Sequence, residues 1–148
     1  MDYQKLKDEL ASDEGYKNEI YLDHLGYPTV GIGHLITKND PEYGSPIGTL
    51  VSGERVIELF LEDIESSVRD CKKLFADFES YSDNIQRVLV NMMFNLGYTK
   101  LLKFRKFRAA VESRDWKQAS IEGLDSLWAR QVPNRARRLM DRLKNECN

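Results

Sequence analysis

EGYKNEIYLDHLGYPTVGIGHL, residues 14–35, is the stretch in which a helical sequence pattern gives way to a strand pattern. Before it, apolar residues recur at helical spacing over residues 1–11, and Gly15 stands where that helix is expected to end. Within it, residues 23–26 favour a turn between two short runs with strand character. The apolar strand positions are Ile20, Leu22, Val30 and Ile32. The segment therefore predicts a helix followed by a small antiparallel hairpin.

The remainder of the chain predicts a loop and then helices. Residues 37–50 are rich in Pro and Gly and favour a loop. A helix from residue 53 to about residue 76 would span roughly 36 Å. Residues 85–96 are apolar nearly all round, which indicates a buried helix that Gly97 ends. Further helices are expected at 104–113, 116–123, 126–130 and from Pro133 onward.

These elements predict an α+β fold with one domain, 1–148, made of two lobes. An N-terminal lobe, 1–52, carries a short antiparallel sheet, and a long helix, 53–79, connects it to an all-helical lobe, 80–148. The helix over residues 1–11 is expected to pack on the helical lobe. A chain of 148 residues buries enough surface to fold without a metal or a disulfide.

Composition and charge exclude several classes of protein. No apolar run reaches the ~20 residues of a membrane span, and the first residues lack the pattern of a secretory signal. Cys71 and Cys147 are expected to be free buried thiols, and two widely spaced histidines do not predict a metal site. No cofactor is expected.

The charge is distributed unequally along the chain. Residues 1–70 hold 6 Lys/Arg and 15 Asp/Glu, whereas residues 71–148 hold 16 and 9. The basic half is suited to an anionic polymer, or the two halves simply attract each other. Basic residues without interleaved exposed aromatics argue against a nucleic-acid partner.

Glu14, Asp23 and Thr29 are the candidate catalytic residues. Two carboxylates that face each other are the usual equipment for cleaving a glycosidic bond. Each residue also has a plain structural interpretation: Glu14 as a carboxylate at a helix end, Asp23 as a turn residue, and Thr29 as a strand residue. The helix dipole disfavours a negative charge at the Glu14 position, which favours a functional role there.

The chain resembles the phage-type lysozymes, the T-even endolysin family of glycoside hydrolase family 24. Eight residues separate the two acids and five separate Asp23 from Thr29, as in that family. The similarity is carried by the strings 13–15, 21–23, 26–35, 91–97 and 128–138, which include Gly31-Ile32-Gly33-His34, Asn95-Leu96-Gly97 and Pro133-Asn134-Arg135.

The resemblance implies a muramidase that cuts the β-1,4 bond between N-acetylmuramic acid and N-acetylglucosamine in peptidoglycan, with inversion, in a cleft between the lobes. It implies that Glu14 is the general acid, that Asp23 is the base or electrostatic partner of the attacking water, and that Thr29 holds that water. His34 is expected to pair with Asp63 in a structural role that raises the pKa of His34. The residues expected to bind substrate are Tyr27, Gly33, Leu35, Phe94, Asn95, Phe104, Gln131 and Arg135, the last reaching toward the acid.

The resemblance also implies a biological setting. We expect a monomer without stable membrane association that waits in the host cytoplasm and reaches the cell wall through a holin-type pore. Two other readings stay open: a lytic transglycosylase, which needs no second carboxylate, and a non-catalytic peptidoglycan-binding module. One departure is the loop 37–50, which is shorter than its counterpart in the family and is expected to lack a small helix.

Overall fold

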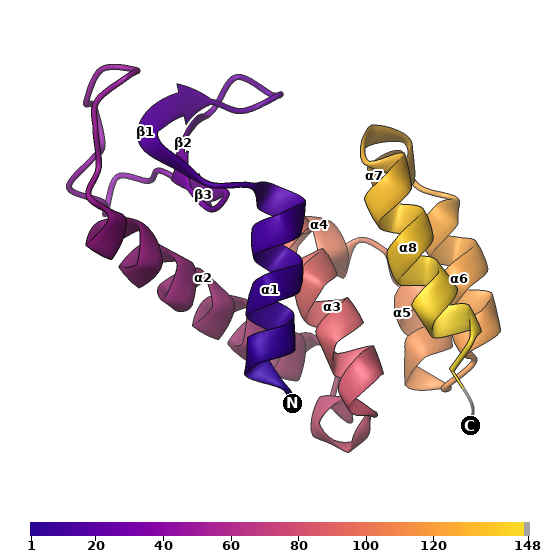
Figure 1. The fold of residues 1–148 in the computed structure, drawn as a ribbon. Coiled ribbons are helices and arrows are strands. Elements are labelled where there is room, and N and C mark those ends of the chain that lie inside the picture. Colours follow the sequence, from indigo (N-terminus) through magenta and orange to yellow (C-terminus); the bar gives the residue numbers. More distant parts are fainter. Residues whose placement is uncertain (147–148) are drawn as a thin grey trace. The chain divides into compact units, whose positions relative to one another are not determined.

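The structure is a computed structural model that describes residues 1–146 (Figure 1). The chain divides into two compact units, which we call the N-terminal unit, Gln4–Glu65, and the helical unit, Met1–Tyr3 with the chain from Ser66 onward. The division falls inside the long helix. A three-stranded sheet at the N-terminal end and helices elsewhere confirm the α+β fold class.

The N-terminal unit contains all of α1 (Tyr3–Glu14) except its first residue, and Gly15 follows the last residue of this helix, as the sequence predicts. The antiparallel sheet has the order β1-β2-β3. Its strands are β1 (Lys17–Leu22), β2 (Pro28–Gly31) and β3 (His34–Leu35). Alternate residues point to opposite faces of a strand, and one face covers a small core. That core contains Ile20, Val30, Ile36 and Leu59, with Val51 packed against it.

The segment after β3 runs back along the outer edge of β1. The backbone of Ile20 accepts from Gly48 N and donates to Thr49 O, at 2.7 and 2.9 Å, and Val51 N donates to Asn18 O. Glu19 and Leu50 form an isolated bridge. The loop prediction for 37–50 is confirmed in that this segment contains turns and no helix, but the pairing with β1 was not predicted.

The long helix α2 spans Gly53–Leu74. Ser52 Oγ accepts from the Arg55 backbone N at 3.1 Å, which satisfies one of the free N–H groups at a helix start. The sequence pattern extended this helix too far. The helix ends at Leu74, and Phe78, which continues the apolar spacing, lies in a separate 3₁₀ turn, Phe78–Ser80.

The helical unit is built around α3 (Asp83–Leu96), most of which is buried. Gly97 follows it with φ of 82°, a conformation that favours glycine, and also precedes α4 (Tyr98–Leu102), a short helix that the sequence analysis missed. The remaining helices are α5 (Arg105–Glu112), α6 (Trp116–Leu124), α7 (Leu127–Gln131) and α8 (Pro133–Lys144).

The packing in this unit is close. A Cβ added at Gly123 of α6 would collide with the side chain of Met140 on α8 and touch Phe107 on α5. Leu139 and Leu143 of α8 are buried. Gly123 therefore permits the close approach of α6 and α8.

Predictions were also made for Ile32, for the two cysteines and for membrane spans. Ile32, predicted in a strand, lies in the turn between β2 and β3. Cys71 is a free buried thiol, and burial raises its pKa, whereas Cys147 lies outside the described residues. Within residues 1–146, none of the helices combines the length and the apolar character needed to cross a membrane.

Candidate active site

Glu14 is the last residue of α1, and its carboxyl group lies against Gly33 in the turn between β2 and β3. A Cβ added at Gly33 would lie 2.6 Å from Glu14 Oε1 and 2.9 Å from its carboxyl carbon. Gly33 has φ of 69° in the two-residue turn between β2 and β3. The absence of a side chain at Gly33 therefore leaves the space that the Glu14 carboxyl group occupies.

Asp23 stabilises the turn between β1 and β2, as the sequence indicates, through one of its two carboxylate oxygens. Its Oδ1 accepts from the backbone N–H groups of Leu25 and Tyr27, each at 2.9 Å. Asp23 N donates to Tyr27 O and Gly26 N donates to Asp23 O, which closes the turn between β1 and β2. Across residues 1–146, Asp23 Oδ2 accepts no hydrogen bond, so one oxygen fixes the side chain and the other is available for chemistry.

Thr29 lies on β2 with 4% of its surface exposed. Its hydroxyl donates to Tyr27 O at 2.9 Å. A hydroxyl group has one hydrogen to donate and two lone pairs. Because the hydrogen is already donated, Thr29 Oγ1 can only accept a hydrogen bond from a further group.

The strand register places three side chains in one row on the sheet face that lies opposite the small core. Thr29 pairs with Tyr21 of β1 on one side and with Leu35 of β3 on the other. Directly opposed residues of antiparallel strands point to the same face. Leu35 is 48% exposed and Tyr27, in the adjoining turn, 55%. Tyr21 suits a short strand by its sequence but was not predicted as a site residue; its pairing with Thr29 places it on this face.

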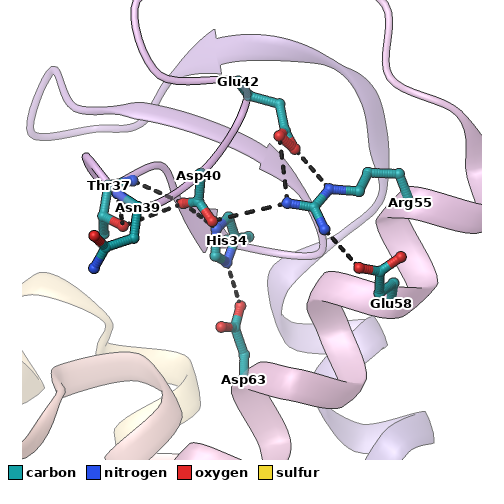
Figure 2. Close-up of polar contacts among 8 residues, drawn as sticks. All are labelled: His34, Thr37, Asn39, Asp40, Glu42, Arg55, Glu58 and Asp63. Carbon is teal, nitrogen blue, oxygen red and sulfur yellow. Dashed lines mark hydrogen bonds and ion pairs between the residues drawn. The ribbon is translucent and has the colours of Figure 1, made fainter.

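His34 is the centre of a polar cluster beside the sheet (Figure 2). Its Nδ1 lies 2.7 Å from Asp63 Oδ2 on α2, and its Nε2 lies 2.8 Å from Asp40 Oδ2 in the loop. The structure thus contains the expected pair with Asp63 and adds a second carboxylate, Asp40, that the sequence analysis missed. Burial by itself lowers the pKa of His34, but the hydrogen bonds and charges of Asp63 and Asp40 outweigh it and raise the pKa to about 9.

Arg55 of α2 extends this cluster into the loop (Figure 2). Its Nε lies 2.7 Å from Glu42 Oε1, its Nη1 lies 2.7 Å from Glu58 Oε1, and its Nη2 lies 3.8 Å from Asp40 Oδ1. Burial raises the pKa of Asp40, but the hydrogen bond from the Thr37 backbone N–H and the contact with His34 outweigh it and lower the pKa. The cluster ties the loop both to α2 and to β3.

The His34 cluster predicts a loss of stability in alkaline solution. The folded-state pKa of about 9 exceeds the ordinary value of 6.5, so the stabilisation is complete below about pH 6.5 and is lost as the pH rises through 9. Because only 12% of the His34 side chain is exposed, we expect a fall of up to about 3 kcal/mol in the free energy of unfolding. Urea titrations at a series of pH values measure it.

Variants separate this effect from general alkaline denaturation. Asp63→Asn should flatten the pH dependence and lower the His34 pKa in an NMR titration. The matched control His24→Gln, in the exposed turn, should keep the wild-type slope. A His34 resonance that titrates near its ordinary pKa, or that ignores Asp63→Asn, would refute the prediction.

The other candidate residues lie in the helical unit, where several have structural contacts. Trp128 Nε1 donates to Asn95 Oδ1 at 2.7 Å, and Phe104 packs edge-on against Phe107. Arg135 is buried, and its Nε donates to Asn91 Oδ1 at 2.9 Å. Arg135 is thus not part of a solvated helix face, although Arg138 is exposed.

The remaining two candidates of this unit differ in exposure. Phe94 is half-buried and Gln131 is exposed at the end of α7. The expected approach of Arg135 toward Glu14 joins two different units, so it stays a prediction. No group of three or more His, Cys, Asp or Glu within residues 1–146 is arranged to hold a metal ion.

Comparison with known proteins assigns the family. The model of the phage lysozyme family matches residues 11–146. The chain belongs to the phage lysozyme family. It is a glycoside hydrolase, in agreement with the two carboxylates of the N-terminal unit.

Individual phage lysozyme relatives cover nearly all of the chain. A probable T4-type lysozyme of Dictyostelium discoideum is 32% identical over 91% of each chain. The pre-baseplate central spike protein Gp5 of Enterobacteria phage T4 is 32% identical over 88% of this chain and 26% of its own. The peptidoglycan hydrolase gp36 of Pseudomonas phage phiKMV is 31% identical over 97% of this chain and 15% of its own.

Gly33→Ala tests the contact between the turn after β2 and the Glu14 carboxyl group. The added methyl group would displace the Glu14 carboxyl group, and alanine at φ of 69° costs about 1–2 kcal/mol. Because Glu14 is the expected general acid and small displacements of a catalytic group are costly, we expect at least a tenfold loss of hydrolysis of purified peptidoglycan.

Gly44→Ala is the matched control for backbone strain. Gly44 also has positive φ, of 84°, but an added Cβ meets nothing within 4 Å. The Gly44→Ala protein should lose about as much stability as the Gly33→Ala protein and should keep its activity. Equal activities of the two variants would show that the contact between Gly33 and Glu14 has no catalytic importance.

Proposed function

We propose that this protein is a muramidase that hydrolyses the β-1,4 bond between N-acetylmuramic acid and N-acetylglucosamine of peptidoglycan, with inversion. The family and the names of the relatives support a peptidoglycan-hydrolysing lysozyme. The bond, the stereochemistry and the residue roles are our proposal.

The proposed roles follow the chemistry of each side chain. Glu14 gives its proton to the leaving sugar oxygen, because the departing alkoxide is a poor leaving group at neutral pH. Asp23 Oδ2 accepts a hydrogen bond from the attacking water and takes its proton as the water oxygen bonds to the anomeric carbon, while Oδ1 stays fixed by the backbone. Thr29 Oγ1 accepts the second hydrogen of that water, since its own hydrogen is donated to Tyr27 O. Both water hydrogens are thus directed away from the reacting lone pair.

One observation carries the proposal. The charges of Glu14 and Asp23 both act on the phenol of Tyr21, whose pKa is raised first by burial and then by these two carboxylates. The Tyr21 phenol is thus near both carboxyl groups, and a glycosidase uses two carboxyl groups that flank the bond it cleaves.

The remaining candidates complete the proposal. Tyr27, Gly33 and Leu35 would contact the sugars from the N-terminal unit. Phe94, Asn95, Phe104, Gln131 and Arg135 would do so from the helical unit. We also propose that the protein acts as a monomer, accumulates in the host cytoplasm and reaches the wall through a holin-type pore.

Analysis of the product ends tests the proposal. Purified protein is incubated with peptidoglycan, and the fragments are identified by mass spectrometry and by NMR of the freshly formed anomer. Reducing muramic acid ends with the α configuration are expected. Anhydro ends would instead indicate a lytic transglycosylase, β ends would indicate retention, and binding without cleavage would indicate a non-catalytic module.

A further inference from the structure

We propose that Tyr21 is a further catalytic residue, whose hydroxyl donates a hydrogen bond to the sugar bound at Glu14 and Asp23. The bond is expected to strengthen as the glycosidic linkage breaks. This inference rests on the proposed function and assigns a third side chain of the N-terminal unit to the same reaction.

The register of the sheet shows on which face Tyr21 lies. Ile20 of β1 packs into the small core with Val30, so the next residue, Tyr21, points to the opposite face. Tyr21 pairs directly with Thr29, and Thr29 pairs with Leu35. The Tyr21 side chain therefore lies next to the side chain of Thr29, which is proposed to hold the attacking water.

The protonation state of the Tyr21 phenol also suits a hydrogen-bond donor. Burial, followed by the charges of Glu14 and Asp23, raises its pKa above the ordinary value of 10.0. Tyr21 is therefore protonated at neutral pH. A neutral phenol adds no further negative charge beside the acidic groups of Glu14 and Asp23, which another ionised acid would do.

The Tyr21 hydroxyl has a hydrogen that it can donate to a substrate. Among residues 1–146, no group accepts a hydrogen bond from it. Lys17 Nζ lies over the face of the ring, 4.4 Å from the centroid, and favours this position of the ring. A positioned donor without a protein acceptor is suited to a substrate oxygen, since catalytic hydrogen bonds often form only in the complex.

Tyr21→Phe removes the hydroxyl and keeps the ring. We expect kcat on soluble peptidoglycan fragments to fall about tenfold, with KM changed less than about twofold. The melting temperature should stay at the wild-type value, because no hydrogen bond of the free protein is lost. The matched control Tyr43→Phe, in the exposed part of the loop, should change neither constant.

A spectroscopic measurement checks contact with the substrate. A peptidoglycan tetrasaccharide is added to Glu14→Gln protein that carries ¹³C in the tyrosine rings, and the Tyr21 Cζ resonance is expected to shift. The Tyr43 resonance serves as the internal reference.

The outcomes separate this inference from the proposed function. An unchanged kcat in Tyr21→Phe, an effect on KM alone, or a Tyr21 resonance that ignores the tetrasaccharide would overturn the role of Tyr21. The proposed function would stand as long as Glu14→Gln is inactive. Full activity of Glu14→Gln would overturn the proposed function itself.

Discussion

Glu14→Gln is expected to lower the rate of peptidoglycan hydrolysis by about a thousandfold. A positioned general acid contributes about 10²–10⁴-fold, and glutamine has no proton that it can give to the leaving oxygen. The substitution keeps the size of the side chain, so the contact with Gly33 remains possible. The fall should therefore appear in kcat, with substrate binding retained.

The comparison needs a variant that removes the same charge elsewhere in the unit. Glu62→Gln does so on the exposed face of α2 and should keep the wild-type rate. Both proteins should unfold at similar temperatures. A Glu14→Gln protein with the full lytic rate would eliminate Glu14 as the acid, whatever the other residues do.

Asp23→Asn is expected to lower the rate by about 10²–10³-fold while leaving the hairpin intact. Asparagine retains an oxygen that can accept from the Leu25 and Tyr27 N–H groups, as Asp23 Oδ1 does. Its amide group takes the place of Oδ2 and can no longer accept a hydrogen bond from water. The loss is therefore chemical, and kcat measures it.

Asp23→Ala separates the chemical loss from the structural one. Alanine removes both hydrogen bonds to the turn, so we expect a similar loss of rate together with about 1–3 kcal/mol of stability. Thermal and urea unfolding of the two variants show the difference. If either variant hydrolyses peptidoglycan at nearly the wild-type rate, the mechanism with two carboxylates is wrong.

Much of the fold could be predicted because its signals are local. Gly15 and Gly97 follow helices at the predicted positions, and the turn at Asp23 depends on hydrogen bonds within five residues. The short helix α4 was missed because five residues give too few turns for an apolar period. Phe78 had the opposite effect: its spacing continues the apolar pattern of α2, so the predicted helix was too long.

The parts of the site that could not be predicted depend on contacts between distant residues. The contact of Gly33 with Glu14 requires both the end of α1 and the turn after β2 to be in place. Asp40 reaches His34 only because the loop takes one particular course. Tyr21 was within reach of the sequence, since the spacing to Asp23 was visible, but its pairing with Thr29 needed the register of the sheet.

The segment that runs along β1 has a consequence for how this protein behaves in concentrated solution. A sheet edge with unpaired backbone groups can recruit a strand of another molecule and start aggregation. Here Gly48, Thr49 and Val51 already bond to the backbone of Ile20 and Asn18 on that edge. The loop therefore protects the hairpin that carries Asp23 from intermolecular pairing, and a shortened loop would expose that edge to neighbouring chains.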